Sequence, residues 1–213
     1  MINWITVNGL QIQTVSVETM RKSDAWTIAN KVPSKELMYR AGKGIFNAAK
    51  WIPKVAIVCG KGNNAGDGFV VASLFKDSNI DCDIYLLSDD FSEDGKYYYD
   101  LCIQKGIKCY KFTESTSLSS YGSIVDCIFG TGFSGEPRGI YNTAINAINQ
   151  AGAYVVSADI NSGLNGDTGE GINYVKSDLT VSIGTFKTGH FSGQSDIAMK
   201  SRINIDIGIE IQE

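Results

Sequence analysis

The chain has 213 residues, of which 43% are hydrophobic and 20% are charged, the composition of an ordinary globular domain. Its formal net charge of −4 comes without a cluster of lysine and arginine, which argues against a nucleic-acid partner, and no apolar run approaches the ~20 residues that span a bilayer. The five cysteines lack Cys-x-x-Cys spacing and the N-terminus lacks the features of a signal peptide, so we expect one cytoplasmic domain over residues 1–213, without disulfides or a zinc site.

Hydrophobic periodicity predicts strands that alternate with helices, the pattern of an α/β fold whose parallel sheet is covered on both faces. The last segment, residues 203–211, alternates isoleucine with polar residues or glycine, which predicts a strand at the sheet edge, antiparallel to the others. In chain order, we expect a helix over 34–50, a strand over 55–58, a helix from near Gly66 to 76, a strand over 83–88, a helix over 93–105, strands over 107–112 and 123–129, a helix over 140–150, and strands over 153–158 and 179–183.

The strand over 55–58 leads into a loop with glycines at positions 60, 62, 66 and 68. Glycine lets a backbone approach a ligand closely, and a helix that begins near Gly66 would direct free N–H groups at an anion. The spacing is one residue longer than the Gly-x-Gly-x-x-Gly motif of dinucleotide-binding enzymes, and no Walker-type Gly-Lys-Ser/Thr follows. Because Asn63, Asn64 and Asp67 lie between the glycines, we interpret the loop as a binding site.

Two further predicted strands end in polar or glycine-rich loops. Ligands of open α/β sheets lie beyond the carboxyl ends of the strands, so we expect these loops to meet the first one. Asp126 and Asp159 lie in or at the end of apolar runs, where a carboxylate requires a hydrogen bond, an ion pair or a cation; each could instead cap the turn that follows. Asn64, Asp126 and Ser162 offer only oxygen ligands, which suit an alkali or alkaline-earth cation.

The single histidine, His190, follows the strand over 179–183. A lone imidazole titrates near neutrality and can serve as a general base, but such a residue is more often simply exposed, and we expect that here.

Three segments together resemble the signature blocks of the YjeF N-terminal family, which comprises NAD(P)H-hydrate epimerases. They are Gly62–Gly68 (Gly-Asn-Asn-Ala-Gly-Asp-Gly), Val125–Gly132 (Val-Asp-Cys-Ile-Phe-Gly-Thr-Gly) and Ala158–Gly163 (Ala-Asp-Ile-Asn-Ser-Gly). Residues 20–24, 38–42 and 184–189 look like further stretches of that family, so the resemblance extends over roughly residues 15–210.

The resemblance implies a Rossmann-like three-layer α/β/α fold, usually homodimeric, that interconverts the R and S epimers of NADHX and NADPHX, in which water has added to C6 of the reduced nicotinamide. We expect no fused dehydratase domain, so a separate dehydratase would complete the repair of these nucleotides. Carried over by position, the substrate-binding residues are Asn63, Asn64, Ala65, Gly66, Asp67, Gly130, Thr131, Gly132, Phe133, Ser134, Gly135, Glu136 and Asp159, and one potassium ion per subunit is held by Asn64, Asp126 and Ser162.

Two positions depart from the family pattern. Ala65 stands where glycine is frequent, a small change if its φ is negative. Asn161 stands where the family has proline, which frees φ and adds a donor, so we expect a less rigid loop around Asp159 and Ser162.

Inversion at C6 can proceed by loss and return of water or by ring opening and closure. Either route needs proton transfer, worth roughly 10²–10⁴ in rate, and we assign that role to Asp159. The main alternative is a catalytically silent scaffold of the same fold for binding or dimerisation, which would be expected to lose Asp67, Asp126 and Asp159. A hydride-transferring dehydrogenase is less favoured because the glycine motif is mis-spaced.

Overall fold

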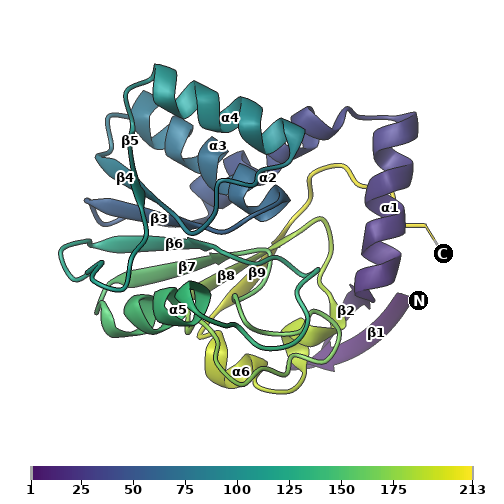
Figure 1. Cartoon of the computed structure of the whole chain (residues 1–213). Coiled ribbons are helices and arrows are strands. Elements are labelled where there is room, and N and C mark those ends of the chain that lie inside the picture. The colour runs from purple at the N-terminus through teal and green to yellow at the C-terminus, as the bar shows by residue number, and fades with distance from the viewer. Residues whose placement is uncertain (1, 213) are drawn as a thin grey trace.

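The computed structural model describes residues 2–212 and contains two sheets (Figure 1). The central sheet has seven strands in the order β5-β4-β3-β6-β7-β8-β9, and every neighbouring pair is parallel. Helices lie on both of its faces, which confirms the predicted three-layer α/β fold. Within the described residues, no helix combines the length and apolar character needed to cross a bilayer.

The strands of the central sheet are β3 (Val55–Cys59), β4 (Cys82–Leu86), β5 (Lys108–Lys111), β6 (Ser123–Cys127), β7 (Tyr154–Ala158), β8 (Leu179–Ile183) and β9 (Arg202–Ile205). The helices are α1 (Val17–Asn30), α2 (Ser34–Ala48), α3 (Asn63–Asp77), α4 (Glu93–Gln104), α5 (Ile140–Gln150) and α6 (Ser195–Ala198), with a 3₁₀ turn over Thr188–Phe191. An antiparallel hairpin of β1 (Ile2–Val7) and β2 (Leu10–Val15), which periodicity did not predict, precedes them.

The apolar runs predicted as strands are buried because helices cover both faces of the sheet. β3 and β6 are buried along their whole length. One core cluster joins the sheet to α2, α3 and α4, and a second joins it to α5. The cysteines follow the same pattern: all five are free, and Cys59 and Cys127 are buried as small apolar residues, as the sequence predicts.

The two central strands place a crevice at the carboxyl edge of the sheet. β3 pairs with β4 on one side and with β6 on the other, so the chain reverses its direction of travel across the sheet between β3 and β6. This is the position at which open α/β sheets bind ligands. Gly60 keeps the two strand ends together, because a Cβ at this position would lie 2.1 Å from the carbonyl oxygen of Ile128.

Helix α3 begins at Asn63, three residues before the predicted start near Gly66. Gly62 precedes it with φ of 76°, a backbone conformation that redirects the chain within one residue. Asn63, Asn64 and Asp67 therefore lie in the first turns of a helix rather than in a loop. The helix begins at the crevice, since Asn63 and Asn64 line a cavity there. Because Gly62 has no side chain to cap the helix, the first backbone N–H groups of α3 are left for a ligand.

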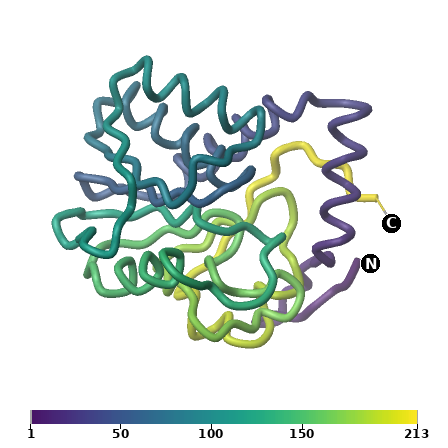
Figure 2. Tube along the Cα trace, viewed as in Figure 1, coloured from purple at the N-terminus to yellow at the C-terminus, as the bar shows by residue number. Residues whose placement is uncertain are grey.

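The prediction for the last segment is wrong in direction and length. β9 lies at the edge of the sheet, as predicted, but it covers only Arg202–Ile205. It runs parallel to β8 because the connection after β8 returns the chain to the end of the sheet where β8 begins. The alternation of isoleucine with polar residues continues past the strand, where Ile207 packs against Leu37 and Ala41 of α2. The tail then passes beside α1 (Figure 2). Glu210 N donates to Thr27 Oγ1 at 3.0 Å and Gln212 N to Ser23 Oγ at 2.8 Å.

Candidate active site

A cavity of about 900 Å³ opens at the crevice between β3 and β6. Its walls come from one face of α1, from α2, the start of α3, the loop after β6, the end of β7 and the C-terminal tail. The structure thus brings together segments that are far apart in the chain. The wall includes these residues from the sequence prediction: Asn63, Asn64, Asp67, Gly130, Thr131, Gly132, Phe133, Ser134, Glu136 and Asp159.

Three of the predicted substrate-binding residues do not line this cavity. Ala65 is fully buried within α3, where its φ is not positive, so the extra methyl group is accommodated. Gly66 faces α2, since a Cβ there would lie 2.5 Å from Met38 Sδ. Gly135 has φ of 91° in an exposed turn. For Ala65 and Gly66 the structure shows helix packing instead of a cavity-facing position.

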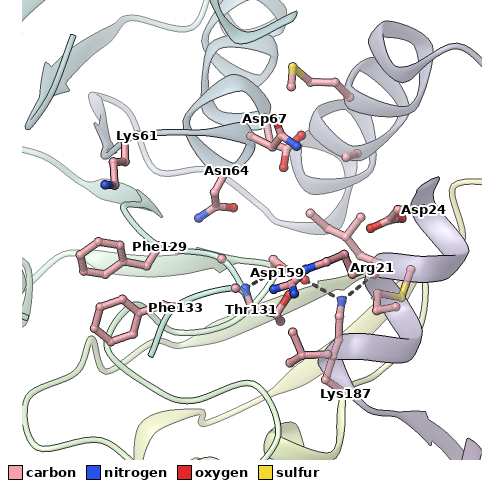
Figure 3. A pocket seen from close by; sticks show the side chains of 18 of the residues that line it. Arg21, Asp24, Lys61, Asn64, Asp67, Phe129, Thr131, Phe133, Asp159 and Lys187 are labelled. Carbon is pink, nitrogen blue, oxygen red and sulfur yellow. Dashed lines mark hydrogen bonds and ion pairs between the residues drawn. The ribbon is translucent and has the colours of Figure 1, made fainter. Parts of the chain in front are cut away.

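Asp159 lies at the centre of the cavity wall with its side chain 15% exposed (Figure 3). Its Oδ1 accepts from Lys187 Nζ at 2.7 Å and its Oδ2 from Thr131 N at 2.9 Å. Burial by itself would raise the pKa of this carboxyl, but the Lys187 ammonium and the Thr131 N–H outweigh it and lower the pKa below the ordinary value. Asp159 is therefore ionised at neutral pH.

Lys187 is the partner that the sequence analysis missed. Its side chain is 2% exposed, and Nζ donates to the carbonyl oxygen of Ile183 at 2.8 Å as well as to Asp159. The residue follows β8, a fourth parallel strand whose carboxyl end meets the same edge of the sheet. The rule that places ligands at strand ends could have singled it out within residues 184–189.

His190 holds this ion pair in place through the backbone. Its Nε2 donates to the carbonyl oxygen of Asp159 at 2.7 Å, and its Nδ1 accepts from Lys187 N at 3.1 Å, so the ring is the neutral Nε2–H tautomer. Burial lowers the pKa of His190 to about 4. The residue is fully buried and absent from the cavity wall, so the expectation that it is exposed is wrong.

Two more carboxyl groups face the same cavity. Burial raises the pKa of Asp67 well above its ordinary value, and the negative charge of Asp159 adds to the effect. Burial also raises the pKa of Asp24 on α1 to about 6. Met20, Asp24 and Ile28 follow one another at helical spacing along the cavity side of α1. Asp24 follows no predicted strand, so its only signal in the sequence is the resemblance of residues 20–24 to the family.

Asn64 carries the unpartnered polar group of the site. Its side chain is buried, and neither the amide oxygen nor the amide nitrogen has a hydrogen-bond partner among residues 2–212. An unsatisfied buried amide is costly and calls for an explanation such as a bound ion or ligand. Gly130 lies between this amide and Asp159: a Cβ on Gly130 would be 3.7 Å from Asn64 Cγ and 3.0 Å from Asp159 Oδ2.

Asp126 and Ser162 lie behind the cavity wall and bond to each other. Ser162 Oγ donates to Asp126 Oδ1 at 2.5 Å, and Ser162 N donates to Oδ2 at 2.9 Å. Ser157 Oγ and Ile128 N complete four donors to one fully buried carboxylate. Ser162 Oγ also accepts from Phe129 N at 2.8 Å, so Ser162 touches the residue before Gly130. Asn64 and Ser162 therefore flank the Phe129–Gly130 segment.

The loop that carries Asp159 and Ser162 is anchored by Asn161, contrary to our expectation of a less rigid loop. The fully buried Asn161 amide donates to Val175 O at 2.8 Å, to Ser177 Oγ at 3.0 Å and to Ala198 O at 3.0 Å. Its oxygen accepts from Thr180 Oγ1. This network ties the loop to β8 and α6, and it supplies by hydrogen bonding the restraint that a proline ring would supply through φ.

Comparison with known proteins identifies relatives along nearly the whole chain. Residues 34–189 match the family described as YjeF-related protein N-terminus. The chain is 34% identical over 183 residues to the bifunctional NAD(P)H-hydrate repair enzyme Nnr of Coxiella burnetii, covering 83% of this chain and 37% of that protein. It is 33% identical over 207 residues to the NAD(P)H-hydrate epimerase of Lentilactobacillus buchneri, covering 92% of this chain and 95% of that protein.

A second epimerase, from Limosilactobacillus fermentum, is 31% identical and is covered over 90% of its length. The chain spans about a third of the bifunctional relatives and most of these two epimerases. Among solved structures, yeast ynu0 has the same fold, with a TM-score of 0.74 at 20% identity over 94% of this chain and 95% of that one.

His190 makes the stability of the chain depend on pH in a defined window. Its pKa falls from 6.5 to about 4 on folding, so between these values the unfolded state binds the extra proton. The contribution of neutral His190 to the free energy of unfolding is complete above pH 6.5 and is lost as pH falls toward 4. At pH 5 the loss is roughly 2 kcal/mol. Asp24, whose pKa is raised, contributes stability that grows as pH falls. The effect of His190 is therefore measured by comparing the wild type with a variant that keeps Asp24.

The measurement is urea unfolding of the wild type and of His190→Gln at pH 7 and pH 5. We expect the stability advantage of the wild type to shrink at pH 5. An advantage that is equal at the two pH values would show that the imidazole is not held neutral.

Proposed function

The chain belongs to the YjeF-related N-terminal family, and from this premise we propose that it is an NAD(P)H-hydrate epimerase, an isomerase that interconverts the R and S epimers of NADHX and NADPHX. The observation that carries the proposal is a cavity lined by two carboxyl groups in opposite surroundings, Asp159 bonded to the Lys187 ammonium at 2.7 Å and Asp67 buried beside it. Lys187 lowers the pKa of Asp159, whereas burial raises the pKa of Asp67. Two carboxyl groups whose environments separate their pKa values form an acid–base pair.

Epimerisation at C6 needs such a pair. In the dehydration route, Asp67 protonates the departing C6 hydroxyl, which leaves as water, and the ring nitrogen stabilises the resulting cation. Asp159 takes a proton from the water that returns on the other face, and exchange with solvent moves that proton from Asp159 back to Asp67. In the ring-opening route, Asp159 takes the hydroxyl proton as the bond from C6 to the ring nitrogen breaks, and reclosure on the other face returns that proton. Both routes conserve atoms and charge, and both use Asp159 as the proton acceptor.

Substrate binding follows from the cavity wall. The uncapped N-terminus of α3, at Asn63 and Asn64, offers backbone N–H groups to a phosphate. Gly130 brings the loop after β6 close to Asp159, and Gly132 leaves the backbone open, because a Cβ at Gly132 would meet nothing within 4 Å. These features suit a nucleotide whose reactive carbon lies near Asp159.

We further propose a potassium site formed by Asn64, Asp126 and Ser162. The donor set fits an alkali cation: all three offer oxygen, and the amide oxygen of Asn64 is buried without a partner in the part of the chain that the structure describes. Asp126 accepts four hydrogen bonds behind the site and supplies its negative charge. A bound cation would supply a fixed positive charge beside the Phe129–Gly130 segment.

The proposed partners follow from the same activity. An epimerase supplies the S form to a dehydratase, and the relatives named bifunctional NAD(P)H-hydrate repair enzymes support this coupling. We propose that this chain acts as a cytoplasmic homodimer whose S product passes to a dehydratase. The rival scaffold is less favoured because Asp67, Asp126 and Asp159 are all present and because Lys187 keeps one of them ionised within a cavity.

The decisive experiment is a coupled assay of an R/S mixture of NADHX with an S-specific dehydratase. The wild type should drive consumption to completion. Asp159→Asn should slow it by roughly 10²–10⁴-fold, because it removes the proton acceptor. Asp89→Asn, a matched change at an exposed aspartate outside the cavity wall, should match the wild type. A stall near half conversion with the wild type would favour the scaffold, and wild-type rates in Asp159→Asn would remove Asp159 from the mechanism.

The cation site is tested by thermal unfolding in KCl and in tetramethylammonium chloride at equal ionic strength. Binding to the folded state alone raises stability by mass action, so the wild type should melt a few degrees higher in KCl. Asn64→Ala should lose this response, whereas Asn47→Ala, at an exposed position on α2, should keep it. An equal response in Asn64→Ala and the wild type would contradict the assignment.

A further inference from the structure

Three aromatic side chains form a stacked row in the wall of the cavity. The ring of Phe129 lies 4.2 Å from that of Phe133, centroid to centroid, at an angle of 19°, and 5.0 Å from that of Tyr141 at 28°. Phe129 and Phe133 lie in the loop after β6, Tyr141 lies in the first turn of α5, and all three line the cavity. Figure 3 shows Phe129 and Phe133 on the side of Asn64 away from Asp24 and Lys187.

Phe133 is held over the cavity by this row. Its neighbours Gly132 and Ser134 are exposed, yet its own ring is half-buried against Phe129. A phenyl ring on an exposed glycine-rich loop presents an apolar face to whatever occupies the cavity. Flat heteroaromatic bases stack on such faces, at roughly 1–3 kcal/mol per base.

Two cations line the same part of the cavity. Lys61 lies just before the N-terminus of α3, and Arg138 lies just before α5. Both side chains are exposed, and neither forms an ion pair with any residue in the described part of the chain. Glu136 is the acidic residue of the intervening loop. The other part of the cavity is lined by the carboxyl groups of Asp24, Asp67 and Asp159, and Arg21 and Lys187 lie beside Asp159 there (Figure 3).

From this division we infer that the aromatic part of the cavity is the adenosine diphosphate subsite. The adenine ring stacks on Phe133, and Lys61 and Arg138 bind the pyrophosphate together with the N-terminus of α3. The inference rests on the proposed function for the identity of the whole ligand. It also gives the orientation of the dinucleotide in the cavity: the hydrated nicotinamide lies toward Asp159 and the adenine toward Tyr141. Neither Lys61 nor Arg138 belongs to the residues that the sequence analysis assigned to the substrate.

The test uses the two halves of the dinucleotide as separate probes. Binding of ADP and of nicotinamide mononucleotide is measured by calorimetry with the wild type, Phe133→Leu, Lys61→Gln and Arg138→Gln. The wild type should bind ADP. Phe133→Leu should weaken ADP binding by about tenfold, since leucine keeps apolar area but loses the flat face. Each charge variant should also weaken ADP binding, and nicotinamide mononucleotide should respond less than ADP to Phe133→Leu.

Matched controls are Tyr97→Leu and Lys111→Gln, an exposed aromatic residue and an exposed lysine that do not line the cavity. Both should bind ADP as the wild type does. Thermal unfolding of each variant separates loss of affinity from loss of fold. If Phe133→Leu lowers the melting temperature but binds ADP with unchanged affinity, the row only supports the loop and the inference fails. Absence of ADP binding by the wild type overturns it as well.

The outcome is independent of the epimerase assay because ADP carries no nicotinamide. Epimerisation by the wild type without a Phe133-dependent ADP site would refute the subsite and leave the function standing. A Phe133-dependent ADP site in a protein that does not epimerise NADHX would refute the function and leave the subsite standing. Adding a 2′-phosphate to the ADP probe then reports whether Lys61 or Arg138 distinguishes the two forms of the substrate.

Discussion

The ion pair between Lys187 and Asp159 is the interaction on which the site depends. Two residues far apart in the chain bring the ends of β7 and β8 together in a buried contact of 2.7 Å, and His190 bonds to the backbone of both. A buried ion pair is weak evidence for stability, because desolvation can cost as much as the attraction returns. Here its consequence is chemical: it holds a carboxylate ionised and aimed into a cavity beside Asp67, whose pKa burial raises.

The parallel sheet explains why so much of the site could be predicted. Every strand of a parallel sheet ends at the same edge, so polar loops after 55–58, 123–129 and 153–158 had to converge, and they do. The apolar runs identify the strands because both faces are covered by helices. The same rule, applied to the strand over 179–183, would have added Lys187. What the residues could not reveal is which carboxylate is paired with a cation, since that depends on side-chain contacts between distant loops.

The features that were not predicted share a physical cause: tertiary contacts decide them. Gly62 alone sets the early start of α3, through a positive φ that no periodicity reports. Alternating isoleucines describe a surface with one buried side, and an irregular tail whose Ile207 packs against α2 satisfies that pattern as well as a strand does. Asn161 shows the same principle: its loss of proline rigidity is visible in the sequence, whereas its compensating hydrogen bonds to Val175, Ser177 and Ala198 are not.

The most direct test of the account is the pH dependence of kcat/KM for epimerisation by the wild type, Lys187→Met and Lys187→Arg. Without the ammonium, burial is unopposed and the pKa of Asp159 rises, so the acidic limb of Lys187→Met should move to higher pH by about 1–3 units. Lys187→Arg, which keeps the charge, should restore much of the wild-type profile. If Lys187→Met, checked for an intact fold by thermal unfolding, loses rate uniformly with an unshifted acidic limb, the ion pair does not govern the ionisation of Asp159.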